Sequence, residues 1–236
     1  MQRVFNSLLF IFVVFYTSIS FSQDAATVNI PKNEYGLEVI ESVELYHKTV
    51  DIDSSKMLVD LNNFIPGIIL DMRYATINNF TGEKVYKSSK AFLRIQAAKA
   101  LLNVEKELNE MGYGLMVFDA YRPYDATLKF YKIVEDKRFV ATPWDGSRHN
   151  RACAVDLTLI NISTGEELKM PTTFDDFSEK AAADYPDLPE EVLKNRKLLI
   201  DVMRKHGFNV IDSEWWHYDY QGWDKYELLN IDHEDL

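Results

Sequence analysis

Two short stretches of this sequence carry side chains that could hold a metal ion. The first contains His149 and, seven residues later, Asp156, where a polar loop gives way to an apolar run. The second contains Glu214 and His217, three residues apart. Two imidazoles and a carboxylate are suitable zinc ligands, and three protein ligands with an open fourth position are typical of catalytic zinc. The spacing therefore permits a site of His149, Asp156 and His217, with Glu214 beside it.

Such a site would support hydrolysis by an activated water. Zinc lowers the pKa of a bound water to near ~7. Glu214 could take a proton from that water and pass it to a leaving amine. Arg122, held by Pro123 at the end of a predicted strand, could stabilise a developing oxyanion. Spacing alone leaves other interpretations open, namely a structural zinc ion or histidines without any metal.

The two ligands of the first stretch must reach the site from different local structures. Cys153 to Ile160 is predicted to be a strand, with apolar side chains at every second residue from Cys153 to Leu159 forming one face. Asp156 lies on the other face, where a cleft can form. His149 is an odd number of residues away, so a continuous strand would point it in the opposite direction. We therefore expect His149 in the preceding loop, folded back toward Asp156.

The second stretch needs a bend. The sequence from Glu214 to Tyr220 is aromatic and β-like. Residues three apart on a straight strand point to opposite faces. A bend is therefore needed to aim both Glu214 and His217 into one site.

The remaining elements suggest one α+β domain. A helix is predicted from an N-cap at Ser88 or Ser89 to Met111, with Gly112 ending it. The other expected elements are a strand with its approaches over 59–74, a strand over 115–118, a helix over about 123–137, a helix over 190–205 ended by Gly207, and strands over 208–211 and 215–220. Helices and strands interleave, and turn-like links favour antiparallel pairing. The expected architecture is a central, mostly antiparallel sheet with flanking helices.

Composition fits a soluble globular protein and argues against a nucleic-acid partner. The chain has 236 residues, of which 47% are hydrophobic and 27% charged, enough for one sizeable core. The formal charge of −11 argues against nucleic acid, whose binding depends on Lys and Arg. Cys153 is the one cysteine, so no intrachain disulfide can form, and its apolar context predicts a buried side chain rather than a nucleophile. No oligomeric state follows from the sequence.

Residues 1–22 have the pattern of a secretory signal peptide. Arg3 is their one charge, Leu8 to Tyr16 is an unbroken apolar run, and small residues precede Gln23. The run is short for a membrane span, although a retained anchor is the alternative. We therefore expect export to the periplasm or the medium, a mature domain of 23–236, and no stable membrane insertion after processing.

Motifs in a fixed order resemble those of the zinc D-alanyl-D-alanine dipeptidases, the vancomycin-resistance-type enzymes. That family shares its fold with zinc D,D-carboxypeptidases and the Hedgehog signalling domain. The motifs span roughly residues 60–220. They are Tyr74-Ala75-Thr76, Asn79-Phe80-Thr81-Gly82, Gly112-Tyr113-Gly114-Leu115, Asp119-x-Tyr121-Arg122-Pro123, Ser147-x-His149-x-x-Ala152-x-Ala154-x-Asp156 and Glu214-Trp215-Trp216-His217-Tyr218.

The resemblance implies hydrolysis of D-alanyl-D-alanine or a similar short dipeptide with one Zn²⁺ per chain. It implies His149, Asp156 and His217 as zinc ligands, Glu214 as general base and acid, Arg122 as stabiliser of the tetrahedral intermediate, Tyr74 and Asp175 at the substrate ammonium, and Ser147 and Tyr86 at its carboxylate. The alternatives are a D,D- or L,D-carboxypeptidase acting on peptidoglycan, and a non-catalytic module with a structural zinc.

One residue departs from the family pattern. Ala152 stands where the family usually has glycine. If this position needs a positive φ, alanine is strained there. If glycine serves only close packing, one methyl group is tolerated.

Overall fold

The computed structural model describes residues 28–236. The predicted signal peptide, residues 1–22, lies outside the described residues. Within 28–236, no helix combines the length and the apolar character needed to cross a membrane.

The centre of the fold is a five-stranded sheet. Its order is β3 (Ile69–Leu70), β5 (Tyr113–Asp119), β6 (Ala154–Asn161), β8 (Glu214–Tyr220) and β7 (Phe208–Ile211). The β3–β5 pairing is parallel and the other three pairings are antiparallel. The predicted α+β architecture with a mostly antiparallel sheet is confirmed.

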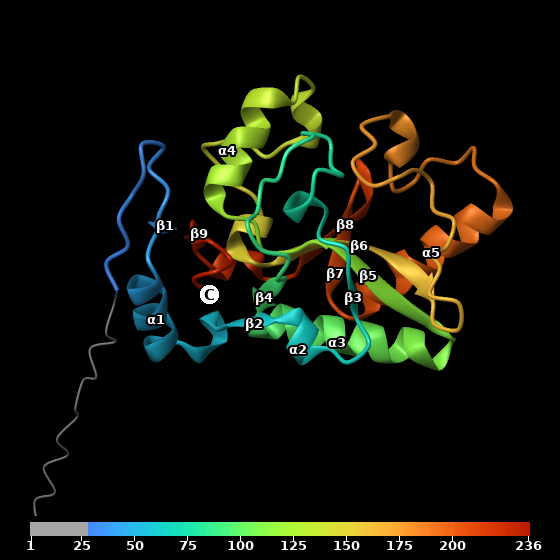
Figure 1. The fold of residues 1–236 in the computed structure, drawn as a ribbon, viewed down its shortest axis with the longest axis horizontal. Helices are drawn as coiled ribbons and strands as arrows, with labels where there is room; N and C mark the ends of the chain where they lie inside the picture. The colour runs from blue at the N-terminus through green and yellow to red at the C-terminus, as the bar shows by residue number, and fades with distance from the viewer. Residues whose placement is uncertain (1–27) are drawn as a thin grey trace, which may run out of the picture.

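Helices lie on both sides of this sheet. Helix α3 (Ile95–Glu110) runs along one side, and α4 (Tyr124–Ile133) lies on the opposite side (Figure 1). Helix α5 (Glu190–Lys205) begins after Pro189, carries acidic residues in its first turn and basic residues in its last, and ends before Gly207 at φ +87°. These charges complement the helix dipole. The helix spans the predicted residues, so its predicted bounds are confirmed.

Two small sheets and two further α-helices lie outside the central sheet. Helices α1 (Val43–Ile52) and α2 (Leu61–Phe64) lie early in it. Strand β1 (Val39–Ile40) pairs in parallel with β9 (Leu228–Leu229), and β2 (Leu58–Asp60) pairs antiparallel with β4 (Phe92–Arg94).

The apolar face of β6 anchors the main core. Val155, Leu157 and Leu159 are fully buried in one cluster with Leu101 and Leu108 of α3. Burying one such side chain stabilises the fold by about 1.5–3 kcal/mol. This packing fixes which face of β6 is left for Asp156, as the alternation predicted.

The predicted start of α3 was wrong. The helix begins at Ile95, not after Ser88 or Ser89, because Phe92–Arg94 forms strand β4 against β2. The predicted strand over 59–74 is also divided into β2, α2 and β3, and α4 ends at Ile133 rather than near 137. For β2, β3 and β4, pairing with a distant strand decides the local structure.

Arg94 ties the loop before β6 to the rest of the molecule. Its side chain is fully buried and donates hydrogen bonds to the carbonyl oxygens of Lys56, Arg151 and Glu227. A buried guanidinium needs such acceptors. Arg94 therefore holds the segment that carries His149 in place.

Candidate metal and catalytic site

A row of polar residues crosses three neighbouring strands. In register, Asp119 of β5 faces Asp156 of β6, and Asp156 faces His217 of β8. Residues directly opposite each other on antiparallel strands project from the same face with Cβ atoms about 4.5–5.5 Å apart. Strand pairing therefore brings Asp156 and His217 together although 61 positions separate them in the sequence.

His149 reaches this row from outside the sheet. It starts a 3₁₀ turn, His149–Arg151, just before β6. Its carbonyl oxygen accepts the backbone N–H of Arg122 at 3.2 Å, which fixes the turn against the end of β5. The expected loop position, folded back toward Asp156, is confirmed.

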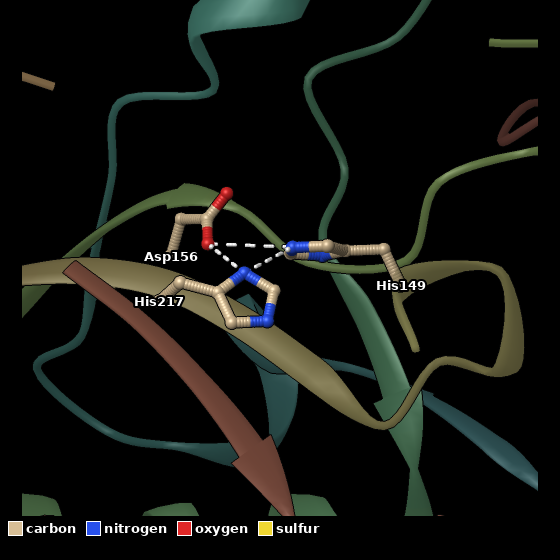
Figure 2. Close-up of side chains that lie close together, drawn as sticks. All are labelled: His149, Asp156 and His217. Carbon is tan, nitrogen blue, oxygen red and sulfur yellow. Dashed lines mark hydrogen bonds and ion pairs between the residues drawn. The ribbon is translucent and has the colours of Figure 1, made fainter. Parts of the chain in front are cut away.

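The three side chains converge on one point (Figure 2). His217 Nδ1 lies 2.9 Å from Asp156 Oδ1, and His149 Nε2 lies 3.3 Å from the same oxygen. The two facing ring nitrogens are 3.1 Å apart. All three residues are buried. Their three candidate ligand atoms lie within 4.8 Å of one another, which suits a single metal ion.

The outer hydrogen bonds of the imidazoles decide which atoms face the centre. His149 Nδ1 donates to the Ala120 carbonyl oxygen at 2.6 Å, and His217 Nε2 donates to Asp219 Oδ1 at 2.9 Å. In the neutral rings, the facing nitrogens then carry lone pairs. Asp156 Oδ1 is buried without a hydrogen-bond donor. Three converging electron pairs in a buried place require a cation, so these residues fit a metal.

Electrostatics favour a cation at the same point. Burial lowers the pKa of His217, but the neighbouring Asp156 and Asp219 carboxylates outweigh it and raise that pKa well above its ordinary value. Burial also disfavours the Asp156 carboxylate, yet the neighbouring imidazoles hold its pKa far below the usual range. A proton and a metal ion therefore compete for the centre, as expected of a ligand set that binds metal with loss of protons.

Glu214 joins the cluster through a bulge in β8. Ile211 faces Glu214, whereas the preceding Val210 faces Tyr218, so three residues of β8 have no partner on β7. This is the bend expected from the three-residue spacing. Glu214 Oε2 comes within 3.9 Å of His217 Nδ1. Burial raises the pKa of Glu214 to about 7, although His217 opposes that shift. A carboxyl group near neutrality can both accept and return a proton.

Arg122 is clamped beside the cluster. Its Nε and Nη2 donate to Asp119 Oδ2 at 3.0 and 2.8 Å, and Nη2 lies 3.8 Å from Asp156 Oδ2. The guanidinium also stacks over the Phe130 and Tyr74 rings, at 4.9 and 5.4 Å from their centroids. Such a fixed cation is suited to stabilising negative charge that develops in a reaction.

Tyr86 does not line this cleft. Its side chain is buried and its hydroxyl donates to Asp119 Oδ1 at 3.0 Å. It borders a separate hollow together with His233, whose ring centroid lies 4.5 Å away. Tyr86 therefore lies outside the cleft, and not beside a substrate carboxylate as the family resemblance implied. The residue instead supports the carboxylate that holds Arg122.

The other expected residues share one cleft. It is lined by Tyr74, Arg122, Ser147, His149, Asp156, Asp175, Glu214 and His217. The Tyr74 hydroxyl lies 3.0 and 3.1 Å from the two Asp175 carboxylate oxygens. Burial, reinforced by the charge of Asp156, raises the pKa of Asp175 well above its ordinary value. A cationic group bound there would stabilise the ionised carboxylate.

Comparisons with known proteins show which family the chain belongs to. The model of a peptidase family described as D-ala-D-ala dipeptidase matches residues 54–233. The chain belongs to this family. A D-alanyl-D-alanine dipeptidase of Escherichia coli (strain K12) is 34% identical over 172 residues, covering 73% of this chain and 89% of that protein. One from Enterococcus faecium is 29% identical over 178 residues, covering 67% and 88%. A solved structure of the LdcB LD-carboxypeptidase covers 84% of this chain and 86% of its own, with 21% identity and a TM-score of 0.43.

In this metallopeptidase, the backbone at Ala152 is strained. The residue has φ 54° and ψ 38°, in the left-handed region, and is fully buried. Its conformation reverses the chain between His149 and β6, and its N–H donates to the His149 carbonyl oxygen at 2.9 Å. Of the two readings of this position, the structure selects the one that requires a positive φ.

Replacing Ala152 tests that conformation. Left-handed backbone costs an L-residue about 1–2 kcal/mol. Glycine avoids this but loses about 0.5–1 kcal/mol in chain entropy and about 0.8 kcal/mol of methyl burial. We therefore expect Ala152→Gly to change the free energy of unfolding by less than about 1 kcal/mol, whereas the branched side chain of Ala152→Val should cost more than about 2 kcal/mol. Urea unfolding at fixed metal concentration measures both, and a valine variant as stable as the original would contradict the assigned backbone.

Two functional neighbours were not recognised in the sequence. Asp119, readable as a turn residue, binds Arg122, and Asp219 binds His217. Two signals were available in the sequence. Asp119 stands three residues before Arg122, and Asp219 stands two residues after His217, on the same face of the strand. Neither signal is specific without knowing which loops and strands meet.

Proposed function

We propose that this protein is a zinc dipeptidase that hydrolyses D-alanyl-D-alanine or a similar short D,D-dipeptide. The observation that carries the proposal is the convergence of His149, Asp156 and His217 on one point, beside Glu214, in a cleft that Asp175 also lines. The names of the related dipeptidases support the choice of substrate. His₂Asp ligation is suited to zinc, and three protein ligands leave a position open.

In the proposed reaction each residue acts at a defined place. Zinc held by His149, Asp156 and His217 would supply an acidified water and a polarised carbonyl group. Glu214 accepts the proton of the attacking water and returns it to the leaving amine. Arg122, fixed by Asp119, stabilises the negative charge of the tetrahedral intermediate. Retention of Glu214 and Arg122 favours an enzyme over a structural zinc module, which needs neither.

The cleft suits a substrate with a free amino group. We infer that the ammonium lies against Asp175, oriented by Tyr74, and that Ser147, beside the ligand His149, lies near the carboxylate. A substrate with a blocked amino group would leave Asp175 half-buried and without a cationic partner. Leaving such a group unsatisfied costs about 1–3 kcal/mol, equivalent to roughly 10–100-fold in rate.

A panel of peptides tests this function. We expect the zinc-loaded protein to cleave free D-alanyl-D-alanine with a kcat/KM about 10–100-fold above that for the N-acetylated form, and chelation to abolish both activities. Longer D,D- and L,D-peptides complete the panel. Preferential cleavage of N-acylated or longer peptides would replace the proposal with a carboxypeptidase. Zinc binding without cleavage of any member would replace it with a structural module.

We propose in addition that the protein is exported. The charged start, short apolar run and small residues of 1–22 support a signal peptide removed before Gln23. The mature enzyme would then meet dipeptides in the periplasm or the medium. Mass spectrometry of protein recovered from those fractions should give a chain that starts at Gln23. A full-length chain held in the membrane would indicate a retained anchor instead.

A further inference from the structure

Asp219 makes a contact that the proposed reaction does not use. It lies two residues beyond His217 on β8, so both side chains project from the same face of the strand. Asp219 Oδ1 accepts the Nε2 proton of His217 at 2.9 Å. Its side chain is only 13% exposed, which shields the hydrogen bond from water. We propose that Asp219 is a positioning residue that fixes the ring and the tautomer of the metal ligand His217.

The chemistry of imidazole gives this contact its consequence. Only the nitrogen without a proton can bind a metal, and the hydrogen bond on the other nitrogen decides which one that is. His217 must present Nδ1, the atom 2.9 Å from Asp156 Oδ1. Asp219 holds the proton on Nε2 and prevents the ring from turning about its Cβ–Cγ bond. For His149 the Ala120 carbonyl oxygen does the same from the backbone.

Asp219 also joins the two segments that carry the histidines. Its Oδ2 lies 3.6 Å from Nε of Arg148, the residue before His149. The Arg148 guanidinium in turn stacks over Trp223, 4.6 Å from the ring centroid. Arg148 is 46% exposed, so this ion pair adds little stability by itself. Its effect is geometric, because it orients the Asp219 carboxylate between the loop and β8.

The inference rests on the metal site of the proposed function but not on the identity of the substrate. The test is therefore zinc affinity, measured by competition with a chromophoric chelator. Asp219→Ala should raise the zinc Kd about 10–100-fold, the usual effect of losing an outer-shell partner. Asp219→Asn keeps the shape and one acceptor oxygen, so a smaller increase is expected. Asp224→Asn, which changes an exposed carboxylate just beyond β8, should leave the Kd unchanged.

A second readout separates positioning from general stability. In the Co²⁺-loaded protein, Asp219→Ala should shift the visible absorption bands, because the geometry at His217 changes. Loss of apo-protein stability with an unchanged zinc Kd and an unchanged cobalt spectrum in both variants would overturn the inference and leave Asp219 a purely structural residue. The isosteric Asp219→Asn variant provides this comparison even if Asp219→Ala does not fold. Wild-type protein that binds no zinc would instead overturn the proposed metal site.

Discussion

Glu214→Ala is expected to keep the bound metal and to lose hydrolysis by a factor on the order of 10² or more. The variant removes a carboxylate 3.9 Å from His217 Nδ1 but leaves His149, Asp156 and His217 in place. Proton transfer from the attacking water and to the leaving amine would both lose their carrier. The measurement is kcat on D-alanyl-D-alanine in samples whose zinc content is determined by mass spectrometry.

The isosteric Glu214→Gln variant and an exposed control complete this experiment. Glu214→Gln should be as inactive as Glu214→Ala, because an amide cannot accept the proton. Glu179→Gln alters an exposed glutamate and should retain full activity. Burial raises the pKa of Glu214 to about 7, and the base form is lost as the pH falls through that pKa. A bound cation lowers this pKa, so kcat/KM should fall on the acid side at or below about pH 7. Undiminished turnover in both variants would exclude Glu214 as the base.

His149→Ala is expected to abolish stoichiometric zinc binding and, with it, activity. The variant removes one of three ligand atoms, and two remaining ligands hold zinc far more weakly. Zinc stabilises a folded protein according to RT ln(1 + [Zn²⁺]/Kd), so the rise in Tm on adding zinc should also disappear. Equilibrium dialysis and thermal unfolding with and without zinc measure the two effects.

A matched histidine variant controls for the loss of an imidazole. His47 is exposed on α1, away from the cleft, and His47→Ala should bind one equivalent of zinc and show the wild-type rise in Tm. A full equivalent of zinc on His149→Ala would remove this residue from the ligand set. A full equivalent of zinc on His217→Ala as well would exclude the cluster as the metal site.

Local sequence patterns were sufficient for several parts of the fold. The alternation of side chains along β6 assigned its apolar residues to the core, and their packing against α3 confirms this assignment. The same alternation required His149 to come from a loop and Glu214 and His217 to be joined by a bend, and both features are present. Helix α5 was bounded by the proline before it and by Gly207 after it. In each case the physical cause lies within a few residues of its effect.

Local patterns failed where a distant segment competes. Phe92 lies at helical spacing from Ile95, yet Phe92–Arg94 forms β4 because β2 supplies its hydrogen-bond partners. Tyr86 was placed at the substrate from the family resemblance, whereas tertiary packing turns its hydroxyl toward Asp119. Such choices depend on which segments meet, and a local pattern carries no information about that.

By itself, the sequence determined the types of ligand, the face of β6 that bears Asp156, and the need for a loop and a bend to complete the cluster. Only the tertiary structure decided the rest. Strand register places Asp119, Asp156 and His217 in one row, and the left-handed Ala152 returns His149 to it. The contacts of Arg122 with Asp119 and of His217 with Asp219 join residues only two or three positions apart, but only the folded chain places them beside the metal ligands. The reason is physical: side-chain alternation is a property of one strand, whereas a metal site requires the pairing of several.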